Sequence, residues 1–453
     1  AGISVVLFDE AHERHLDSDL GLALALESRS ILREDLRVLV MSATIDGARF
    51  AELLGAGASV IESEGRAHPL RVEWLGSSPQ VPVEDAMAQA IATAWRQEEG
   101  DILAFLPGVR EIERTRERVE ARLPSAIVLP LHGQVDPAGQ RVAIRRDAKG
   151  RRRIVLATAI AETSLTLDGV SVVVDAGLSR RAEFDRAAGT THLVTHRASQ
   201  AAAAQRAGRA ARQGPGVAYR LWEEAGHGGR PRYDPPEMLI SDLAPLVLAL
   251  AQWGSTDPAE LAWLDPPPSA SVGAARETLS ALAALDADGR ITERGRKLAQ
   301  LPLDPQGAAT VLFGAEHGAA DQAARIALLL QERGLGGRGD DLEARLSRWN
   351  ADRGARAEAS RKLAGRWAKR AQALADDQRS TALPPPGILL AAGRPEFIAK
   401  RRDKAGENWV AAGGRGFVLD PVSPLARAEF LVVGDAQGRA KGARITSAIA
   451  LAE

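Results

Sequence analysis

The chain has 453 residues, a formal net charge of −1 and a hydrophobic fraction of 45%. That length is too great for one core, so three or more domains are expected, and no apolar run approaches the length that spans a bilayer. The absence of cysteine excludes disulfides and thiolate metal sites and favours a reducing, cytoplasmic location, while the near-neutral charge restricts any nucleic-acid contact to a local groove.

Residues 1–67 alternate between short apolar runs and helical periodicity, which predicts a parallel sheet flanked by helices. The expected strands are Val5–Phe8 and Arg37–Met41, with a helix over Leu16–Ser30. Asp9 and Glu10 directly follow the first strand, so a buried parallel strand would deliver two acids to the carboxyl edge of the sheet. In phosphate chemistry such an Asp holds Mg²⁺ and such a Glu orients water, although a solvated acidic loop is the simpler alternative.

Ser42 and Thr44 follow the second expected strand. Two hydroxyls at a strand end can bond neighbouring carboxylates or cap the next helix. Capping is the better interpretation of these residues alone. Their place one strand after Asp9 and Glu10 favours a role in coupling the two strand ends.

A second α/β pattern covers residues 68–235, and its sites again follow strands. Gly108 ends a strand and opens a helix, where it fits either a plain turn or close approach of a phosphate. Thr158 begins a loop in which Ser164, Thr166 and Asp168 alternate with leucines, which favours a site over a solvated loop. The expected strands are Ile102–Leu106, Ala126–Leu131, Ile154–Ala157 and Val170–Val174.

Gln205, Arg209 and Arg212 form the second strong signal. Their spacing by four and three places them on one face if the segment is helical. One amide and two guanidinium groups suit a terminal phosphate and its transition-state charge. The alternative is a solvated Arg-rich helix, and Gly208 with its small neighbours argues against that alternative.

Helical periodicity then dominates as far as three consecutive prolines at 384–386. Ile291–Gly295 is a candidate wing strand. Short strands with Gly-rich turns follow the prolines and predict a small barrel, over Trp409–Ala412, Gly416–Leu419, Glu429–Val433 and Ala443–Thr446. The histidines lack metal-ligand spacing with acids on one element, so no zinc site is expected.

Asp-Glu-Ala-His at 9–12, Ser-Ala-Thr at 42–44 and Gln-Arg-Ala-Gly-Arg-x-x-Arg at 205–212 occur in an order that resembles the DEAH-box helicases of superfamily 2. Residues 253–268 and 388–446 look like the bacterial HrpB-type branch. The resemblance implies two RecA-like domains with ATP between them, followed by a winged helix, a helical bundle and an OB-like barrel along single-stranded nucleic acid, with RNA the expected substrate. The implied divisions are 1–67, 68–235, 236–295, 296–385 and 386–453.

The resemblance also assigns roles residue by residue. Asp9 would hold Mg²⁺, Glu10 would position water, and His12 would couple this motif to Gln205. Among the remaining implied roles, Gln205, Arg209 and Arg212 would sense the terminal phosphate, and Ser42 and Thr44 would link ATP state to strand movement. Ser164, Thr166 and Asp168 would lie between nucleotide and nucleic acid. Gly108, Thr158 and Arg180 would contact nucleic acid, and a hairpin over Ala182–Val194 would separate strands.

The sequence departs from the family in three ways. Ala159 stands where the family usually has Asn, and Ala211 replaces a Gly. No Gly-x-x-x-x-Gly-Lys-Ser/Thr occurs, so the Lys that cradles the β- and γ-phosphates is missing. We therefore expect a fragment of a helicase that is inactive alone. The alternatives are a non-catalytic nucleic-acid-binding protein derived from a helicase, and a P-loop signalling ATPase, which does not explain the barrel.

Overall fold

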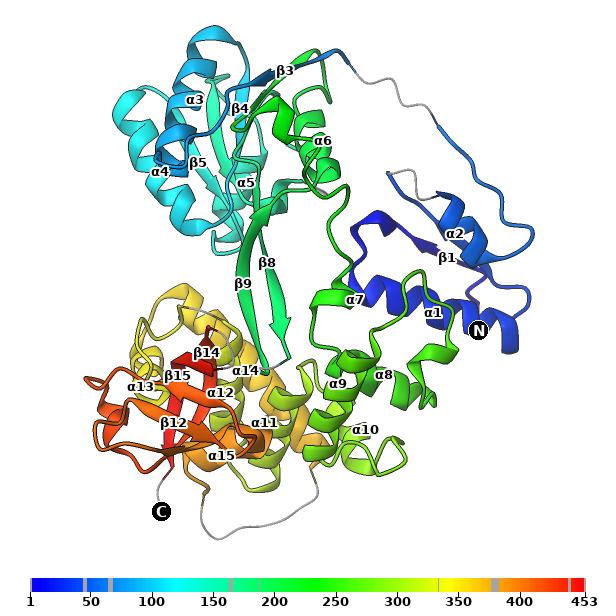
Figure 1. Cartoon of the computed structure of the whole chain (residues 1–453), viewed down its shortest axis with the longest axis vertical. Helices are drawn as coiled ribbons and strands as arrows, with labels where there is room; N and C mark the ends of the chain where they lie inside the picture. Colours follow the sequence, from blue (N-terminus) through cyan, green and yellow to red (C-terminus); the bar gives the residue numbers. More distant parts are fainter. Residues whose placement is uncertain are drawn as a thin grey trace. The chain divides into compact units, whose positions relative to one another are not determined.

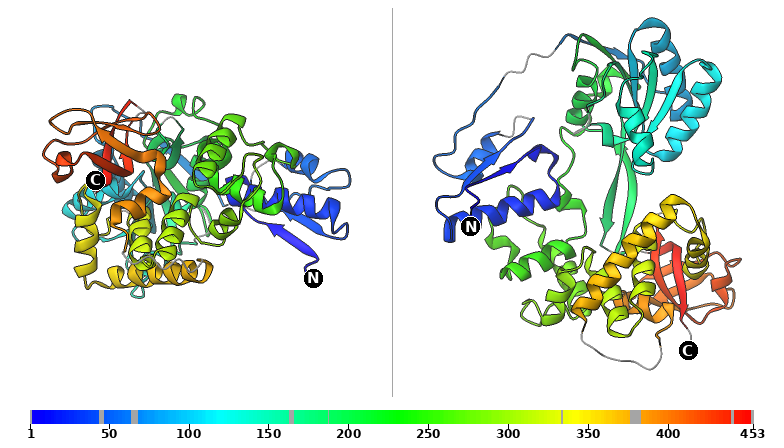
Figure 2. Two further views of the ribbon diagram at one scale, coloured as in Figure 1. Left: turned by 90° about the horizontal axis from the view of Figure 1, so that it is seen from below. Right: turned by 180° about the vertical axis from the view of Figure 1, so that it is seen from behind.

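The computed structural model describes residues 2–43, 47–63, 68–162, 166–186, 188–332, 334–375, 383–438 and 441–451. Their contacts group them into two compact units, each continuous in space but not in sequence (Figures 1 and 2). The first unit is Ala1–Met41, Glu183–His192 and Pro236–Glu453, and the second is Ser42–Ala182 and Leu193–Pro235. The five-part division expected from the sequence stays a prediction.

A six-stranded parallel sheet forms the centre of the second unit, in the order β3-β10-β7-β4-β6-β5. β4 and β6 are buried along their whole length, because helices cover both faces of the sheet. Ile102 packs in a core with α3 and α4, and its neighbour Leu103 packs on the opposite side with α5 and α6. The strands are β3 (Leu70–Trp74), β4 (Asp101–Phe105), β5 (Ile127–Leu131), β6 (Arg153–Ala157), β7 (Val170–Asp175) and β10 (Gly216–Arg220). The helices of this unit are α2 (Gly47–Leu54), α3 (Val83–Gln97), α4 (Val109–Arg122), α5 (Pro137–Ile144) and α6 (Gln200–Gly208), with one-turn helices at Ala159–Ala161 and Glu224–Gly226.

The expected hairpin is present and longer than predicted. Strands β8 (Leu178–Asp185) and β9 (Thr190–Arg197) pair in a two-stranded sheet of their own, drawn as a long ribbon in Figure 1. The base of the hairpin belongs to the second unit, and the tip at Glu183–His192 is grouped with the first.

In the first unit, β1 (Val5–Phe8) and β2 (Arg37–Val40) pair in parallel beside α1 (Leu16–Ile31). The prediction of a buried first strand is wrong, since Val5 is 45% exposed and Leu7 is 58% exposed. Side chains alternate between the two faces of a strand, and the described residues cover only one face of this pair.

The helical region contains one further correction. The wing strand expected at Ile291–Gly295 is reduced to a single antiparallel bridge between Leu285 and Ile291. Thr292 accepts a hydrogen bond from Gly295 N and so begins a helix where the strand was expected. The helices are α7 (Glu237–Ile240), α8 (Ala244–Trp253), α9 (Ser269–Ala281), α10 (Glu293–Ala299), α11 (Pro305–Glu316), α12 (Ala320–Gln331), α13 (Leu342–Ala351), α14 (Ala355–Leu374) and α15 (Pro386–Gly393), with one-turn helices at Ala11–Glu13 and Pro258–Glu260. None of the described helices is both long and apolar enough to cross a bilayer.

The last segment forms a closed five-stranded barrel, which confirms the predicted small β domain. Trp409, Phe397 and Phe417 fill its core. The strands are β11 (Ile398–Arg401), β12 (Asn408–Ala411), β13 (Gly416–Val418), β14 (Phe430–Gln437) and β15 (Lys441–Leu451), with one-turn helices at Pro395–Phe397 and Pro424–Arg427.

Candidate functional site

The acid loop, residues 9–15, follows β1 and is shaped by its own backbone. Glu10 adopts a left-handed conformation with φ of 50°, and its N–H donates to Asp9 Oδ1 at 2.9 Å. Ala11 N donates to Met41 O at 3.0 Å, which ties the loop to the residue after β2. The Asp9 side chain is exposed at the carboxyl end of its strand, where a cation could reach it.

Glu10, His12 and Glu13 come together next to Asp9. One potential ligand atom from each lies within 4.8 Å of the others, and His12 Nδ1 is 3.5 Å from Glu10 Oε2. The expectation that no histidine shares an element with acids at ligand spacing is therefore wrong for this group, because Ala11–Glu13 forms one turn of helix. Mg²⁺ prefers oxygen ligands, so the imidazole makes this trio a poorer magnesium site than the Asp9 carboxylate.

Arg14 anchors the end of the acid loop. It is buried, has a left-handed φ of 53°, and forms a two-pronged ion pair with Asp19 in α1, with Nη2–Oδ2 at 2.9 Å. Its Nη1 reaches Asp265 Oδ2 at 2.5 Å, on the segment before α9. Burial raises the pKa of Asp19, and the Arg14 guanidinium partly opposes that effect.

His15 makes a second link to the helical region. Its Nε2 lies 2.7 Å from Glu13 Oε2, and its Nδ1 lies 3.0 Å from Glu237 Oε1 at the start of α7. Glu237 Oε2 also accepts the N–H of Leu16 at 2.8 Å. Burial lowers the pKa of His15, but the bonds to Glu237 and Glu13 outweigh it and leave that pKa raised. Sequence reasoning missed both links, since their partners lie more than two hundred residues away in the chain.

Of the predicted coupling residues, two lie outside the described part of the chain. Ser42 follows Met41 and is exposed, whereas Thr44 lies outside the described residues. Ser164 also lies outside them, and Thr166 is exposed. Asp168 Oδ1 accepts a bond from Gln213 Nε2 at 3.0 Å, and Gln213 Oε1 accepts from Gly169 N at 3.0 Å. Gln213 therefore joins the 158–169 loop to the segment after α6.

The arginine motif is only partly helical. Gln205 is half-buried on α6, but the helix ends at Gly208 and Arg209 is its C-cap. Tight turns follow, with Arg209 N bonded to Arg206 O at 3.1 Å. The prediction that Arg212 shares a helical face is therefore wrong, because Gly208 weakens the helix and Arg212 lies exposed beyond its end. Ala211, the departure from the family pattern, is accommodated in a buried position.

Arg206, which sequence reasoning passed over, is the buried residue of this motif. It is 1% exposed, with Nη1–Asp175 Oδ1 at 2.8 Å and Nη2–Glu162 Oε1 at 2.5 Å. Burial raises the pKa of Glu162, and the nearby Arg206 charge acts against that rise. Arg209 Nε donates to Glu162 O at 3.0 Å, so Glu162 contacts both Arg206 and Arg209.

Two of the predicted nucleic-acid contacts, Gly108 and Arg180, lie together. Gly108 precedes α4, and a Cβ added there would lie 2.3 Å from Arg180 Nη1 and 2.8 Å from Glu111 Oε2. Arg180 pairs with Glu111 at 3.1 Å and donates to Thr195 Oγ1 at 3.0 Å. Thr158, the third such residue, follows β6 and precedes the one-turn helix that starts at Ala159.

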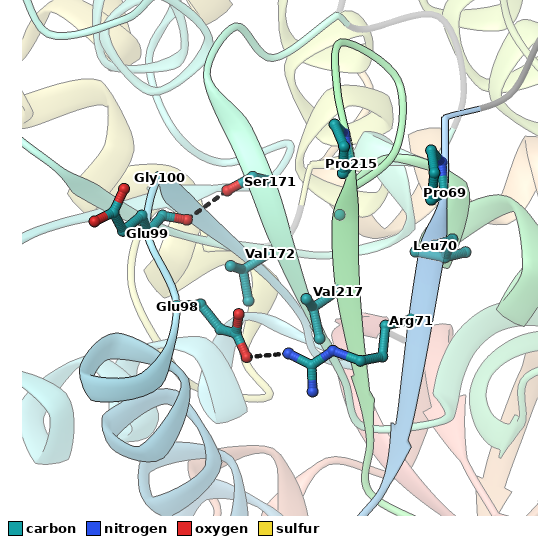
Figure 3. A pocket seen from close by; sticks show the side chains of 11 residues that line it. Pro69, Leu70, Arg71, Glu98, Glu99, Gly100, Ser171, Val172, Pro215 and Val217 are labelled. Carbon is teal, nitrogen blue, oxygen red and sulfur yellow. Dashed lines mark hydrogen bonds and ion pairs between the residues drawn. The ribbon is translucent and has the colours of Figure 1, made fainter.

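A hollow of about 630 Å³ lies at the edge of the same sheet where its strands begin (Figure 3). Pro69, Gly100 and Pro215 line it where strands begin, away from the carboxyl edge that α/β proteins use for ligands. Its polar groups bond one another, as in the 2.5 Å contacts of Ser171 Oγ with Glu99 O and of Arg71 with Glu98. We therefore do not assign chemistry to this hollow.

Comparison with known proteins shows which families this chain resembles. The model of the helicase conserved C-terminal domain matches residues 84–214, and that of the helicase-associated HA2 winged-helix domain matches residues 275–303. The ATP-dependent RNA helicase HrpB of Escherichia coli is 40% identical over 433 residues, which is 95% of this chain and 52% of that protein. The pre-mRNA-splicing factor ATP-dependent RNA helicase prp22 of Schizosaccharomyces pombe is 34% identical, over 72% of this chain and 28% of its own length.

Solved structures give the same result. A crystal structure of the E. coli DEAH/RHA helicase HrpB superposes with a TM-score of 0.85 and 38% identity, over 100% of this chain and 56% of that one. A second HrpB crystal structure, described as a DExH-box NTPase, gives 0.83 and 38%, over 100% and 55%. The chain thus spans about half the length of HrpB. These matches confirm the resemblance to HrpB-type DEAH/RHA helicases.

Proposed function

We propose that this chain, related over 95% of its length to the RNA helicase HrpB, carries part of the machinery that couples ATP hydrolysis to movement on RNA. One observation carries the proposal: an acid pair at the end of β1 and an arginine motif at the end of α6 occur in a chain of this ancestry. Acids that hold a metal and orient water, together with guanidiniums that meet phosphate charge, are the two halves of a phosphoryl-transfer site. A cytoplasmic location is part of the same proposal.

The acid loop fits the magnesium half of such a site. Bound ATP with Mg²⁺ would supply the phosphoanhydride to be cleaved. The exposed Asp9 carboxylate offers the hard oxygen ligand that Mg²⁺ prefers, and Glu10 next to it would orient a water. His12, whose Nδ1 lies 3.5 Å from Glu10 Oε2, would hold that carboxylate in position and respond to changes in the charge around it.

Gln205, Arg209 and Arg212 would meet the terminal phosphate. The bond from Arg209 Nε to the Glu162 carbonyl fixes one guanidinium beside the 158–169 loop. Gln213 from the segment after α6 bonds Asp168 in the same loop, so Thr166 and Asp168 would transmit nucleotide state within this unit. Ser42, Thr44 and Ser164 would share that coupling role.

RNA is the proposed partner because the matched relatives are named as RNA helicases. Gly108, Thr158 and Arg180 would contact its backbone. Gly108 opens α4, whose first backbone N–H groups suit a phosphate, and Arg180 lies directly against it. The β8–β9 hairpin would separate strands.

A second function has one specific observation in its favour. Ala159 and Ala211 stand where the family usually has Asn and Gly, and these departures favour a chain that binds nucleic acid and does not hydrolyse ATP. The two functions differ in turnover and agree in strand binding.

Strand binding tests what the two functions share. A fluorescent oligouridine titrated onto the chain should bind with an affinity that falls steeply as salt rises, because released counterions drive phosphate contact. A matched oligodeoxyuridine arm decides whether the 2′-hydroxyl contributes. Binding that ignores salt, or no binding of either strand, would overturn the proposal.

A further inference from the structure

We propose that a pocket at the base of the β8–β9 hairpin, between Arg197 and Arg230, holds one nucleotide of a single strand. The phosphate would meet the guanidiniums, and the base would lie on the apolar wall. This inference rests on the proposed nucleic-acid function and adds a site separate from Gly108, Thr158 and Arg180.

The pocket lies at the ligand-binding edge of the six-stranded sheet. Gly76, Ala176 and Leu221 line it where β3, β7 and β10 end, and Leu178 and Arg197 line it from the hairpin. Its volume is about 350 Å³. Pockets for small ligands span about 300–1,000 Å³, so this pocket, near the lower end of that range, is large enough for one nucleotide and too small for a larger ligand.

The lining carries a net positive charge. Its titratable residues are Arg197, Arg230 and Glu223, which sum to +1. Burial, together with the charges of Arg220 and Arg230, lowers the pKa of the neighbouring His227, as a positive field does. A phosphodiester carries one negative charge and matches this balance, and guanidiniums meet phosphate oxygens with paired hydrogen bonds.

Two donors on the pocket wall are buried without a partner among the described residues. They are Trp222 Nε1 and Arg230 Nε, in side chains only 5% and 7% exposed. Both are held rigidly, since Arg230 Nη1 donates to Gly177 O at 2.8 Å and its Cζ lies 4.0 Å from the Trp222 ring centre. Native proteins seldom leave such groups unsatisfied, which sets this wall apart from an ordinary core.

The apolar wall supplies the surface that a base requires. Val81, Leu178 and Leu221 line the pocket beside the indole edge. A flat heterocycle can cover such residues. A bare phosphate or a sulfate would leave the apolar wall uncovered.

The pocket also continues the surface formed by Gly108 and Arg180. The Arg180–Thr195 bond pairs the two hairpin strands, at 3.0 Å. Side chains two residues apart share one face of a strand, so Leu178 lies on the face of Arg180 and Arg197 lies on the face of Thr195. A strand that contacts Gly108 and Arg180 would reach the pocket within the same hairpin face, which favours a nucleic acid over an acidic peptide.

Substitution of the exposed Arg197 tests the site without disturbing the core. We would measure anisotropy of a fluorescein-labelled oligouridine of about 12 nucleotides across a KCl series. Because each phosphate contact on a single strand contributes about 0.7 to the slope of log K against log salt, Arg197→Gln should flatten that slope by about 0.7 and weaken binding about fivefold at 0.1 M. Arg71→Gln is the matched control, since it removes the same charge from the opposite edge of the same sheet and should leave the slope unchanged.

Photo-crosslinking locates the contact directly. An oligouridine containing 4-thiouridine should crosslink within residues 221–230, and excess uridine monophosphate should suppress that crosslink more than inorganic phosphate does. An Arg197→Gln slope equal to that of the unsubstituted chain, with no crosslink there, would overturn the pocket and leave strand binding intact. Displacement by an acidic, apolar peptide but not by uridine monophosphate would also overturn it. A chain that binds no strand at all would overturn both this site and the proposed function.

Discussion

Replacing Arg206 by Met should destabilise the second unit severely. Arg206 is 1% exposed and Asp175 is 2% exposed, and the guanidinium bonds Asp175 Oδ1, Glu162 Oε1 and the Leu178 carbonyl. The methionine fills much of the same volume but leaves two carboxylates without their counter-charge. Removal of one partner from a buried ion pair costs about 3–5 kcal/mol, so the free energy of unfolding should fall by about that amount.

Urea denaturation measures this loss, with hydrogen exchange of β7 and α6 assigning the transition to the right unit. Arg212→Gln is the matched control, because Arg212 is exposed in the same motif and its loss should change stability by no more than about 0.5 kcal/mol. The triple variant Arg206→Met, Asp175→Asn, Glu162→Gln should recover most of the loss, since neutral groups of similar shape leave no buried charge.

The pH dependence provides a further check on Arg206. Burial already raises the pKa of Glu162, and loss of Arg206 should raise it more. An acid with a raised folded pKa binds more protons in the folded state, so stability falls as pH rises through that pKa. The deficit of Arg206→Met should therefore shrink at acidic pH. A deficit below about 1 kcal/mol at neutral pH would refute the reasoning, because the pair would then not be a buried structural one.

Three more outcomes are expected. The purified chain should show no nucleic-acid-stimulated ATPase, and turnover that disappears in Glu10→Gln would contradict this. Gly108→Ala should push the Arg180 guanidinium aside at little cost in stability, since a flexible side-chain end is what the new Cβ meets, and oligouridine affinity measured by anisotropy should fall; an unchanged affinity would remove Gly108 from the contact. Glu237→Gln should lower the raised pKa of His15 in an NMR titration. A His15 pKa that does not move in this variant would contradict the contact. The His15 contribution to stability is full below its unfolded pKa of about 6.5 and is lost as pH rises through the raised folded value.

Apolar runs in the sequence predicted β4, β5, β6 and β7 of the central sheet, but they did not predict β3 and β10. β3 reads Leu-Arg-Val-Glu-Trp and β10 reads Gly-Val-Ala-Tyr-Arg, so neither presents a continuous apolar run. β3 is an edge strand, and its Arg71 and Glu73 pair with each other at 2.5 Å in solvent. Side chains on an edge strand need not be apolar, which removes the signal for β3. β10 lies inside the sheet, but its apolar run is short, because Gly216 precedes it and Arg220 ends it.

The arginine motif was also predicted only in part from the sequence. Helical spacing selected Gln205 and Arg209, but it could not show that the helix ends at Gly208 or that Arg206 points into the core. Those facts depend on Glu162 and Asp175, which come from other elements. Local pattern selects candidate residues, and tertiary partners decide which of them are buried for structural reasons.

The two contacts that anchor the acid loop bear on the order in which the protein folds. Arg14 and Asp265 are separated by 251 residues in sequence, and His15 and Glu237 by 222. Contacts between residues so distant in sequence close a long loop of chain, and they form slowly because that closure must be offset by other interactions. The loop that bears Asp9 and Glu10 leaves the ribosome before residue 265 does, so it reaches its final geometry only after residue 265 has followed it out.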